Sequence, residues 1–129
     1  MSSVIVTPLI NGERNVVLHV YIKGDGLGDV EDYELADPAD YGMTGEDRFF
    51  TIDKIQSGLS GFSATLKFEY LASDTLIWAI PEFHSDYDFT CHGGLKDRSS
   101  VLDGTGKILI STSGLANGDH GSFVIKLRK

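Results

Sequence analysis

The sequence is short of cysteine, proline and long apolar runs, and each shortage excludes a class of protein. Cys91 is the only cysteine, so no intrachain disulfide can form, which suits a reducing cytosol. Three prolines against fifteen glycines indicate many tight turns and no extended linker. No apolar run approaches the roughly 20 residues that span a bilayer. We therefore expect one folded domain over residues 1–129 that does not insert into a membrane.

Basic charge is also scarce. Eleven Lys and Arg face nineteen Asp and Glu, which gives a formal net charge of −8. Proteins that bind nucleic acid draw most of their affinity from cations on phosphate, so this balance argues against DNA and RNA partners. Charge repulsion also disfavours binding to anionic membrane surfaces, whereas the negative net charge is compatible with binding to a basic protein. The start of the chain has no basic segment before a long apolar core, so we expect no signal peptide.

Alternation of apolar and polar residues dominates the chain, and this period of two is the pattern of β-strands. It is clearest from Phe62 to Tyr70 and recurs in Asn15–Lys23, whose second face is also partly apolar and predicts a central strand. No window has a helical period, since the best candidate, Asp53–Leu59, is interrupted by Gly58. Further strands are expected at Val4–Ile10, Asp32–Ala36, Phe49–Ile55, Thr75–Ile80, Phe83–Phe89, Lys107–Thr112 and around Phe123–Leu127.

Turn residues separate these segments. Asn11-Gly12 and Asn117-Gly118 each lie between two predicted strands and are typical of type I′ hairpins, because both residues tolerate positive φ. Ala36–Asp47 lacks β patterning and predicts a long excursion. Together these features predict an all-β fold, a jelly-roll-like β-sandwich of about eight or nine mostly antiparallel strands.

The stretch from Asp25 to Asp47 holds nine acidic residues and no Lys, Arg or His. Clustered carboxylates near glycine turns raise the hypothesis of calcium binding, but an EF-hand counted from Asp25 would have Leu27 at its third position. We favour a solvated, self-repelling loop or a face for a basic partner. The predicted interface residues in this stretch are Tyr33, Asp37, Asp40 and Tyr41.

His84, Asp86 and Asp88 alternate within a predicted strand, so their side chains should share one face. Such a trio could ligate a divalent metal, with His92 as a further donor. The opposite face would carry aromatic residues, and a half-exposed strand turns its polar residues outward in any case. Those aromatic residues are Phe83, Tyr87 and Phe89. We therefore favour an ordinary solvent face over a metal site.

Two further motifs resemble catalytic or cofactor-binding ones only superficially. Cys91-His92 would be a nucleophile beside a base, but neighbours on a strand point to opposite faces. A cysteine hydrolase built on another histidine is strongly disfavoured. Gly104-Thr-Gly-Lys107 lacks the Walker pattern, which needs glycine at Val101 and Ser or Thr at Ile108, and it leads into a strand. We expect a turn there, no catalytic residue and no cofactor.

Aromatic residues could form a sugar-binding platform, as in lectin-like sandwiches. The candidates are Trp78, Tyr21, Tyr33, Tyr41 and Tyr87. Trp78 lies between Leu76 and Ile80 in an alternating segment, so we expect it to pack in the core. Tyr33 and Tyr41 are better contact residues because they lie in the acidic stretch.

Four stretches resemble small structural proteins of tailed bacteriophage virions, and the resemblance spans most of the chain. They are Val16–Lys23, Gly93–Asp97, Asp103–Thr112 and Gly121–Lys129. The resemblance implies a β-sandwich subunit of the capsid decoration (cement) type, often a trimer that clamps neighbouring capsomers. No site residues carry over, because that role depends on surfaces.

We therefore expect a non-enzymatic virion structural protein, a decoration subunit that stabilises the head. It would be made in the host cytoplasm, lie on the capsid surface or in the head–tail region, and bind the major capsid protein or other virion proteins as a homo-oligomer. One alternative is a structural module of the neck or tail. Another is a carbohydrate- or calcium-binding β-sandwich module.

Overall fold

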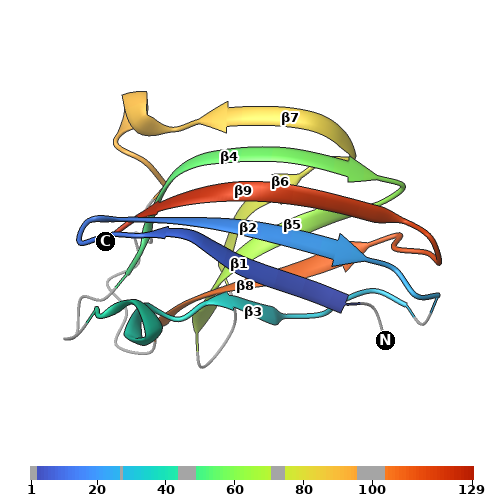
Figure 1. The fold of residues 1–129 in the computed structure, drawn as a ribbon, viewed down its shortest axis with the longest axis horizontal. Helices are drawn as coiled ribbons and strands as arrows, with labels where there is room; N and C mark the ends of the chain where they lie inside the picture. The colour runs from blue at the N-terminus through green and yellow to red at the C-terminus, as the bar shows by residue number, and fades with distance from the viewer. Residues whose placement is uncertain (1–2, 27, 44–48, 71–74, 96–103) are drawn as a thin grey trace.

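Two antiparallel sheets make up the fold in a computed structural model that describes residues 3–26, 28–43, 49–70, 75–95 and 104–129 (Figure 1). The first sheet has the order β1-β2-β9-β4-β7 and the second β3-β8-β5-β6. The strands are β1 (Ser3–Asn11), β2 (Asn15–Lys23), β3 (Tyr33–Ala36), β4 (Thr51–Ser60), β5 (Ser63–Tyr70), β6 (Thr75–Ile80), β7 (Phe83–Asp88), β8 (Gly104–Ser113) and β9 (His120–Arg128). Two short 3-10 turns, η1 (Pro38–Tyr41) and η2 (Thr90–His92), complete the described elements. The predicted all-β sandwich is confirmed.

The strand order is that of a jelly roll with one added strand. Without β1, the two sheets read β2-β9-β4-β7 and β3-β8-β5-β6, two interleaved Greek keys. Most connections therefore pass from one sheet to the other, and β5–β6 is the hairpin that remains within the second sheet. In Figure 1 the strands β7, β4, β9, β2 and β1 follow one another from top to bottom, and β1 ends the series.

The core lies between the sheets and is filled by every second residue of the central strands. Val16, Leu18, Val20 and Ile22 of β2 are fully buried, and Phe123 of β9 is 1% exposed. Between them on β2, Val17, His19 and Tyr21 are half-buried, as expected for a central strand with two covered faces. Because the side-chain period is two, the pairing of β2 with β9 turns both apolar sets to the same side.

Two predicted type I′ turns are not formed. The hairpin between β1 and β2 is present, but neither Asn11 nor Gly12 has positive φ. Its turn is centred on Glu13-Arg14, two residues further on, and is closed by a bond of 2.8 Å from Gly12 N–H to Asn15 C=O. Asn117-Gly118 does not make a hairpin, because β8 and β9 belong to different sheets. In that turn Gly118 has positive φ and Asn117 does not, and the Asp119 N–H donates to Ala116 C=O at 3.1 Å, as in a type II turn.

Strand ends also differ from the predictions. β4 continues to Ser60, so the weak helical candidate Asp53–Leu59 is strand, with a bulge between Ile52 and Lys54. β8 begins at Gly104, so Gly104–Lys107 is strand and the predicted turn there was wrong. Gly106, at φ +79°, lies where the β5–β8 register shifts. Val101 lies outside the described residues.

Candidate functional site

Three carboxylates of the acidic stretch meet where β3 leads into η1. The oxygens of Glu34, Asp37 and Asp40 lie within 4.8 Å of one another, and we call this group the acidic corner. Its geometry is local: Asp37 caps η1 by accepting a bond of 3.1 Å from the Ala39 N–H, and Pro38 occupies the first turn. The tight turn brings Asp40 back beside Asp37. Carboxylate oxygens at this spacing are the donors that calcium takes.

A lysine from β8 opposes this negative charge. Lys107 Nζ is 3.7 Å from Glu34 Oε2 and 4.0 Å from Asp37 Oδ2. β8 and β3 are neighbours in the second sheet, so strand pairing positions the cation. The acidic corner is thus partly neutralised from within the chain.

Replacing Lys107 by Met should lower the free energy of unfolding modestly, by at most about 1 kcal/mol, because these ion pairs are partly exposed. Chemical denaturation at low ionic strength would measure the loss, and it should shrink in high salt as screening weakens the carboxylate repulsion. Lys23→Met is the matched control, because it removes the same charge from an exposed site on β2. Equal losses in both variants at low salt would contradict the role of Lys107.

The four predicted interface residues have different surroundings. Asp37 and Asp40 come together, and Glu34 joins them although the sequence did not single it out. Tyr33 on β3 is 43% exposed. Tyr41 packs edge-on against Phe50 with ring centroids 5.8 Å apart, and burial, followed by the charge of Asp40, raises the pKa of its hydroxyl. Tyr41 is therefore mainly a packing residue, whereas Tyr33, Glu34 and Asp40 are exposed.

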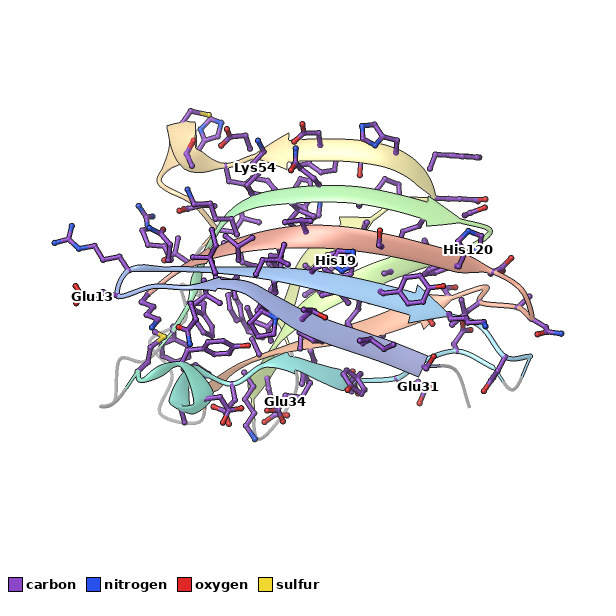
Figure 2. All side chains as sticks on the ribbon, in the orientation of Figure 1. Glu13, His19, Glu31, Glu34, Lys54 and His120 are labelled. Carbon is purple, nitrogen blue, oxygen red and sulfur yellow. The ribbon has the colours of Figure 1, made fainter. Side chains whose placement is uncertain are left out.

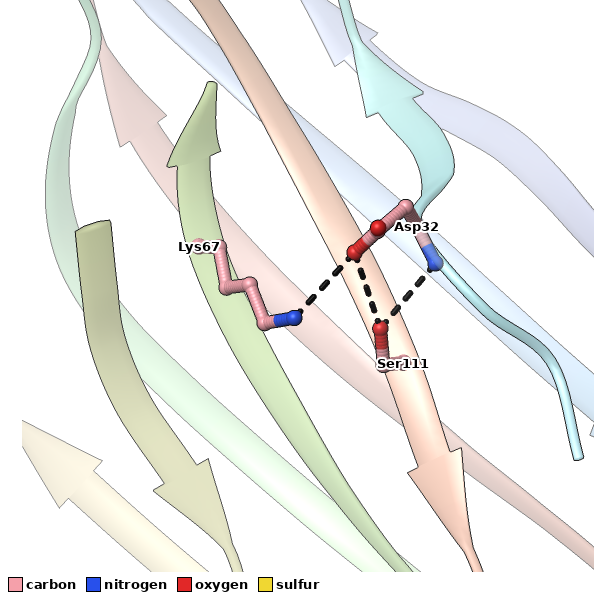
Figure 3. A network of polar contacts seen from close by, with 3 residues as sticks. All are labelled: Asp32, Lys67 and Ser111. Carbon is pink, nitrogen blue, oxygen red and sulfur yellow. Dashed lines mark hydrogen bonds and ion pairs between the residues drawn. The ribbon is translucent and has the colours of Figure 1, made fainter. Parts of the chain in front are cut away.

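Other acids of the same stretch fasten it to β8. Asp32 accepts from Ser111 Oγ and pairs with Lys67 Nζ, both at 3.2 Å from Oδ1, and its N–H donates to Ser111 Oγ at 3.0 Å (Figure 3). Asp29 Oδ1 accepts from Thr112 Oγ1 at 3.2 Å and from the Leu115 N–H at 2.8 Å. Both acids are exposed, as in a solvated loop, but they are held by hydrogen bonds and an ion pair and are not self-repelling. Glu46 and Asp47 lie outside the described residues.

His84, Asp86 and Asp88 share the exposed face of β7, as predicted. Asp88 Oδ1 accepts from Thr90 Oγ1 at 2.6 Å and from the Thr90 N–H at 2.9 Å, and these bonds lower the pKa of the carboxyl. Within the described residues the acidic corner alone brings three such ligand atoms within 4.8 Å, so this trio and His92 do not converge. The structure therefore adds no support for a metal on β7.

The aromatic face predicted opposite this trio is only partly formed. Phe83 is 73% exposed with φ +77°, because it follows directly on the corner between β6 and β7. Trp78 contacts both Tyr87 and Phe89 edge-on, with centroids 5.0 Å apart in each case, and packs against the core as expected. Leu76 is 60% exposed, since a register shift in the β5–β6 pair separates it from the face of Trp78.

The remaining candidate aromatics lie elsewhere. Tyr21 is on β2 in the first sheet and Tyr33 is on β3 in the second, while Tyr41 packs on Phe50. The five aromatic residues therefore do not form one platform.

Cys91 and His92 lie on η2 and not on a strand, so the reason given for separating their side chains was wrong. Both residues are exposed, and no hydrogen bond joins their side chains in the part of the chain that the structure describes. The loop after η2 returns to β4, where the N–H groups of Ile52 and Leu95 donate to each other's carbonyls at 2.9 and 2.8 Å. η2 is thus a short, firmly attached turn.

Lysines and histidines gather on the outer face of the first sheet, beside Asp86 and Asp88 of β7, and sequence reasoning missed this cluster. The strand register puts lysines of three strands and histidines of three strands on the outer face of the first sheet. They are Lys23, Lys54, Lys126, His19, His84 and His120. Figure 2 shows His19, Lys54 and His120 on that sheet, whereas Glu31 and Glu34 lie beside β3. Only pairing between distant strands reveals this cluster of lysines and histidines.

No protein-family model, no curated protein and no solved structure matches this chain. In the described ranges, no helix has the length and apolar character that crossing a bilayer requires.

Proposed function

We propose that this protein is a non-enzymatic structural subunit of a tailed-phage virion, a capsid decoration protein that binds other virion proteins through its outer surfaces. The observation that carries the proposal is the dispersal of the reactive side chains. The β7 trio, the Cys91-His92 turn and the acidic corner occupy separate exposed positions on the sandwich. Surfaces of this kind suit binding better than bond-making, which needs groups that converge on one reacting atom.

The fold and the charge distribution also support this function. The jelly roll recurs in viral capsid and lectin domains, so it is compatible with both a virion role and a carbohydrate-binding one. The acidic corner offers a negative surface to a basic partner. A net charge of −8 favours solubility before assembly. The sequence resemblance provides the partner class, namely major capsid or other virion proteins.

The test is quantitative mass spectrometry of purified particles together with rebinding to particles stripped of this protein. We expect a copy number that matches capsid symmetry. Asp40→Lys should weaken rebinding by about tenfold if the acidic corner faces a basic surface. Asp86→Lys is the matched control, since it reverses one exposed charge on β7 and should rebind normally. Recovery of the protein from host lysate alone, never from particles, would overturn the proposal.

The acidic corner is relevant to one of the alternative functions, calcium binding. Because Lys107 already opposes these carboxylates, we expect calcium chloride to leave the melting temperature unchanged relative to sodium chloride of equal ionic strength. A calcium-specific rise that disappears in Asp40→Asn would favour the calcium-binding module.

A further inference from the structure

The strand β1 is an edge that nothing in the described fold covers. It is added to the eight strands of the jelly roll and pairs on one side with β2, while no described strand pairs with its other side. Its Ile5 is 55% exposed, on the outer face of the sheet beside Tyr21. An open edge presents a row of backbone donors and acceptors that can pair with a further strand.

This edge differs from each of the other three in charge or in the length of its uninterrupted ladder. Ser3–Asn11 contains no charged residue in a chain of net charge −8. The edge strand β7 carries Asp86 and Asp88, and β3 has only four residues, Glu34 among them. β6 is uncharged but short, and a register shift interrupts its ladder. Because β1 is uncharged and has a longer uninterrupted ladder than β6, the other uncharged edge, it is the edge that can best pair with a second copy of this acidic chain.

We propose that β1 pairs antiparallel with β1 of a second copy through Ser3–Thr7, about a two-fold axis at Ile5. The segment reads Ser-Val-Ile-Val-Thr, the same in side-chain type in both directions. The axis sets Ile5 opposite the second copy's Ile5, Val4 opposite Val6, and Ser3 opposite Thr7. The two-fold axis makes every contact away from the axis occur twice, and here each position also meets a side chain of its own type, so no apolar residue faces a polar one. No charge faces a charge within the pair.

Proline sets the length of this ladder. Pro8 has no N–H to donate, and a register shift follows between Pro8 and Ile10. Pairing therefore ends at Thr7 and is confined to the five self-complementary residues. On the outer face, the register of β1 with β2 extends the Ile5 pair into a row that runs Tyr21, Ile5, Ile5, Tyr21 across both copies. On the inner face, Val4 and Val6 already pack partly against the core.

The contact joins the two first sheets into one continuous sheet. It stands apart from the virion proposal, because a symmetric dimer forms in solution whether or not particles are present. It also differs from the trimer that the family resemblance implies, in which a β1 edge would have to meet a different edge of the next copy.

The experiment compares the oligomeric state of three proteins by sedimentation velocity over a wide concentration range. We expect a dimer for the parent chain and a monomer for Ile5→Lys, with dimer affinity lowered at least about tenfold because like charges would face each other on the axis. Ile10→Lys is the matched control: Ile10 is also 55% exposed on β1 but lies beyond Pro8, so this variant should remain a dimer. Melting temperatures verify that both variants fold.

A mixing experiment tests the two-fold axis itself. Ile5→Lys and Ile5→Glu should each be monomeric alone and should form a heterodimer when mixed, because position 5 meets position 5. Recovery on mixing supports the isologous pair. A monomeric parent at every concentration, a trimer or open-ended oligomer, or two monomeric variants that stay apart on mixing would each overturn the proposal.

Discussion

Replacing Gly94 by Ala should lower the free energy of unfolding by about 3 kcal/mol, a large loss for one added methyl group. Gly94 has φ +87°, a left-handed conformation that costs an L-residue about 1–2 kcal/mol. A Cβ there would also lie 2.9 Å from Asp53 Oδ1 and 3.1 Å from Ile52 O, and closest of all to Thr51 Cγ2. Thr51 and Asp53 are buried at the start of β4, so neither can move aside easily.

The neighbouring glycine supplies the control. Gly93 has a similar φ of +81°, but a Cβ there would meet no atom within 4 Å. Gly93→Ala should therefore carry only the conformational cost, about 1–2 kcal/mol. Urea denaturation of both variants separates this strain from the close contact with β4. Equal losses would mean that the loop does not press on Thr51 and Asp53.

This loop is important because several contacts converge on it. Arg128 Nη2 donates to Gly93 O at 2.7 Å and lies 3.5 Å from Asp53 Oδ1, so the C-terminal strand binds the loop and opposes a buried carboxylate. A displaced loop would weaken both contacts, which is why we expect the larger loss at Gly94.

Phe123→Ala should be more damaging still, with a loss of about 3–5 kcal/mol. Phe123 is 1% exposed on β9, between Val20 of β2 and Ser57 of β4. Removing its ring leaves a cavity between the sheets that the flanking strands cannot close, since their hydrogen bonds hold them in place. Urea denaturation with an unchanged m-value would measure the loss.

The next residue is the matched control. Val124 lies on the same strand but on the outer, half-buried face, opposite His19 and Gln56. Val124→Ala should cost about 1 kcal/mol or less. Because a one-residue slip of β9 would exchange the two faces, a larger loss at Val124 than at Phe123 would show the register to be wrong.

Each of the nine predicted strands overlaps an observed one, and Asn15–Lys23 and Thr75–Ile80 match in both bounds. Alternation is a local property of the chain, so the sequence alone could reveal it. Errors occurred where pairing with a strand far away in the chain determines the local backbone conformation, and with it the face on which a side chain lies. Phe83 is exposed because the chain turns a corner between sheets there, and Leu76 because the β5–β6 register shifts.

The candidate site was predictable to a similar degree. Asp37 and Asp40 follow from a dense local run of acids, and their approach follows from the short turn that Asp37 caps. Lys107 could not be foreseen as their counter-ion, since it arrives only through the pairing of β8 with β3. The bonds of Asp29 and Asp32 could not be predicted either, because their partners on β8 are remote in the chain.

By itself the sequence determined which residues alternate, which charges dominate and where the chain cannot be helical, because these follow from steric and solvation preferences of adjacent residues. Only the tertiary structure decided which strands are neighbours, that β1 is an open edge, and that lysines and histidines of distant strands gather on the outer face of the first sheet. The physical reason is that strand pairing joins residues far apart in the chain, and every backbone strand offers the same hydrogen bonds. The choice among partners therefore depends on packing of the whole core.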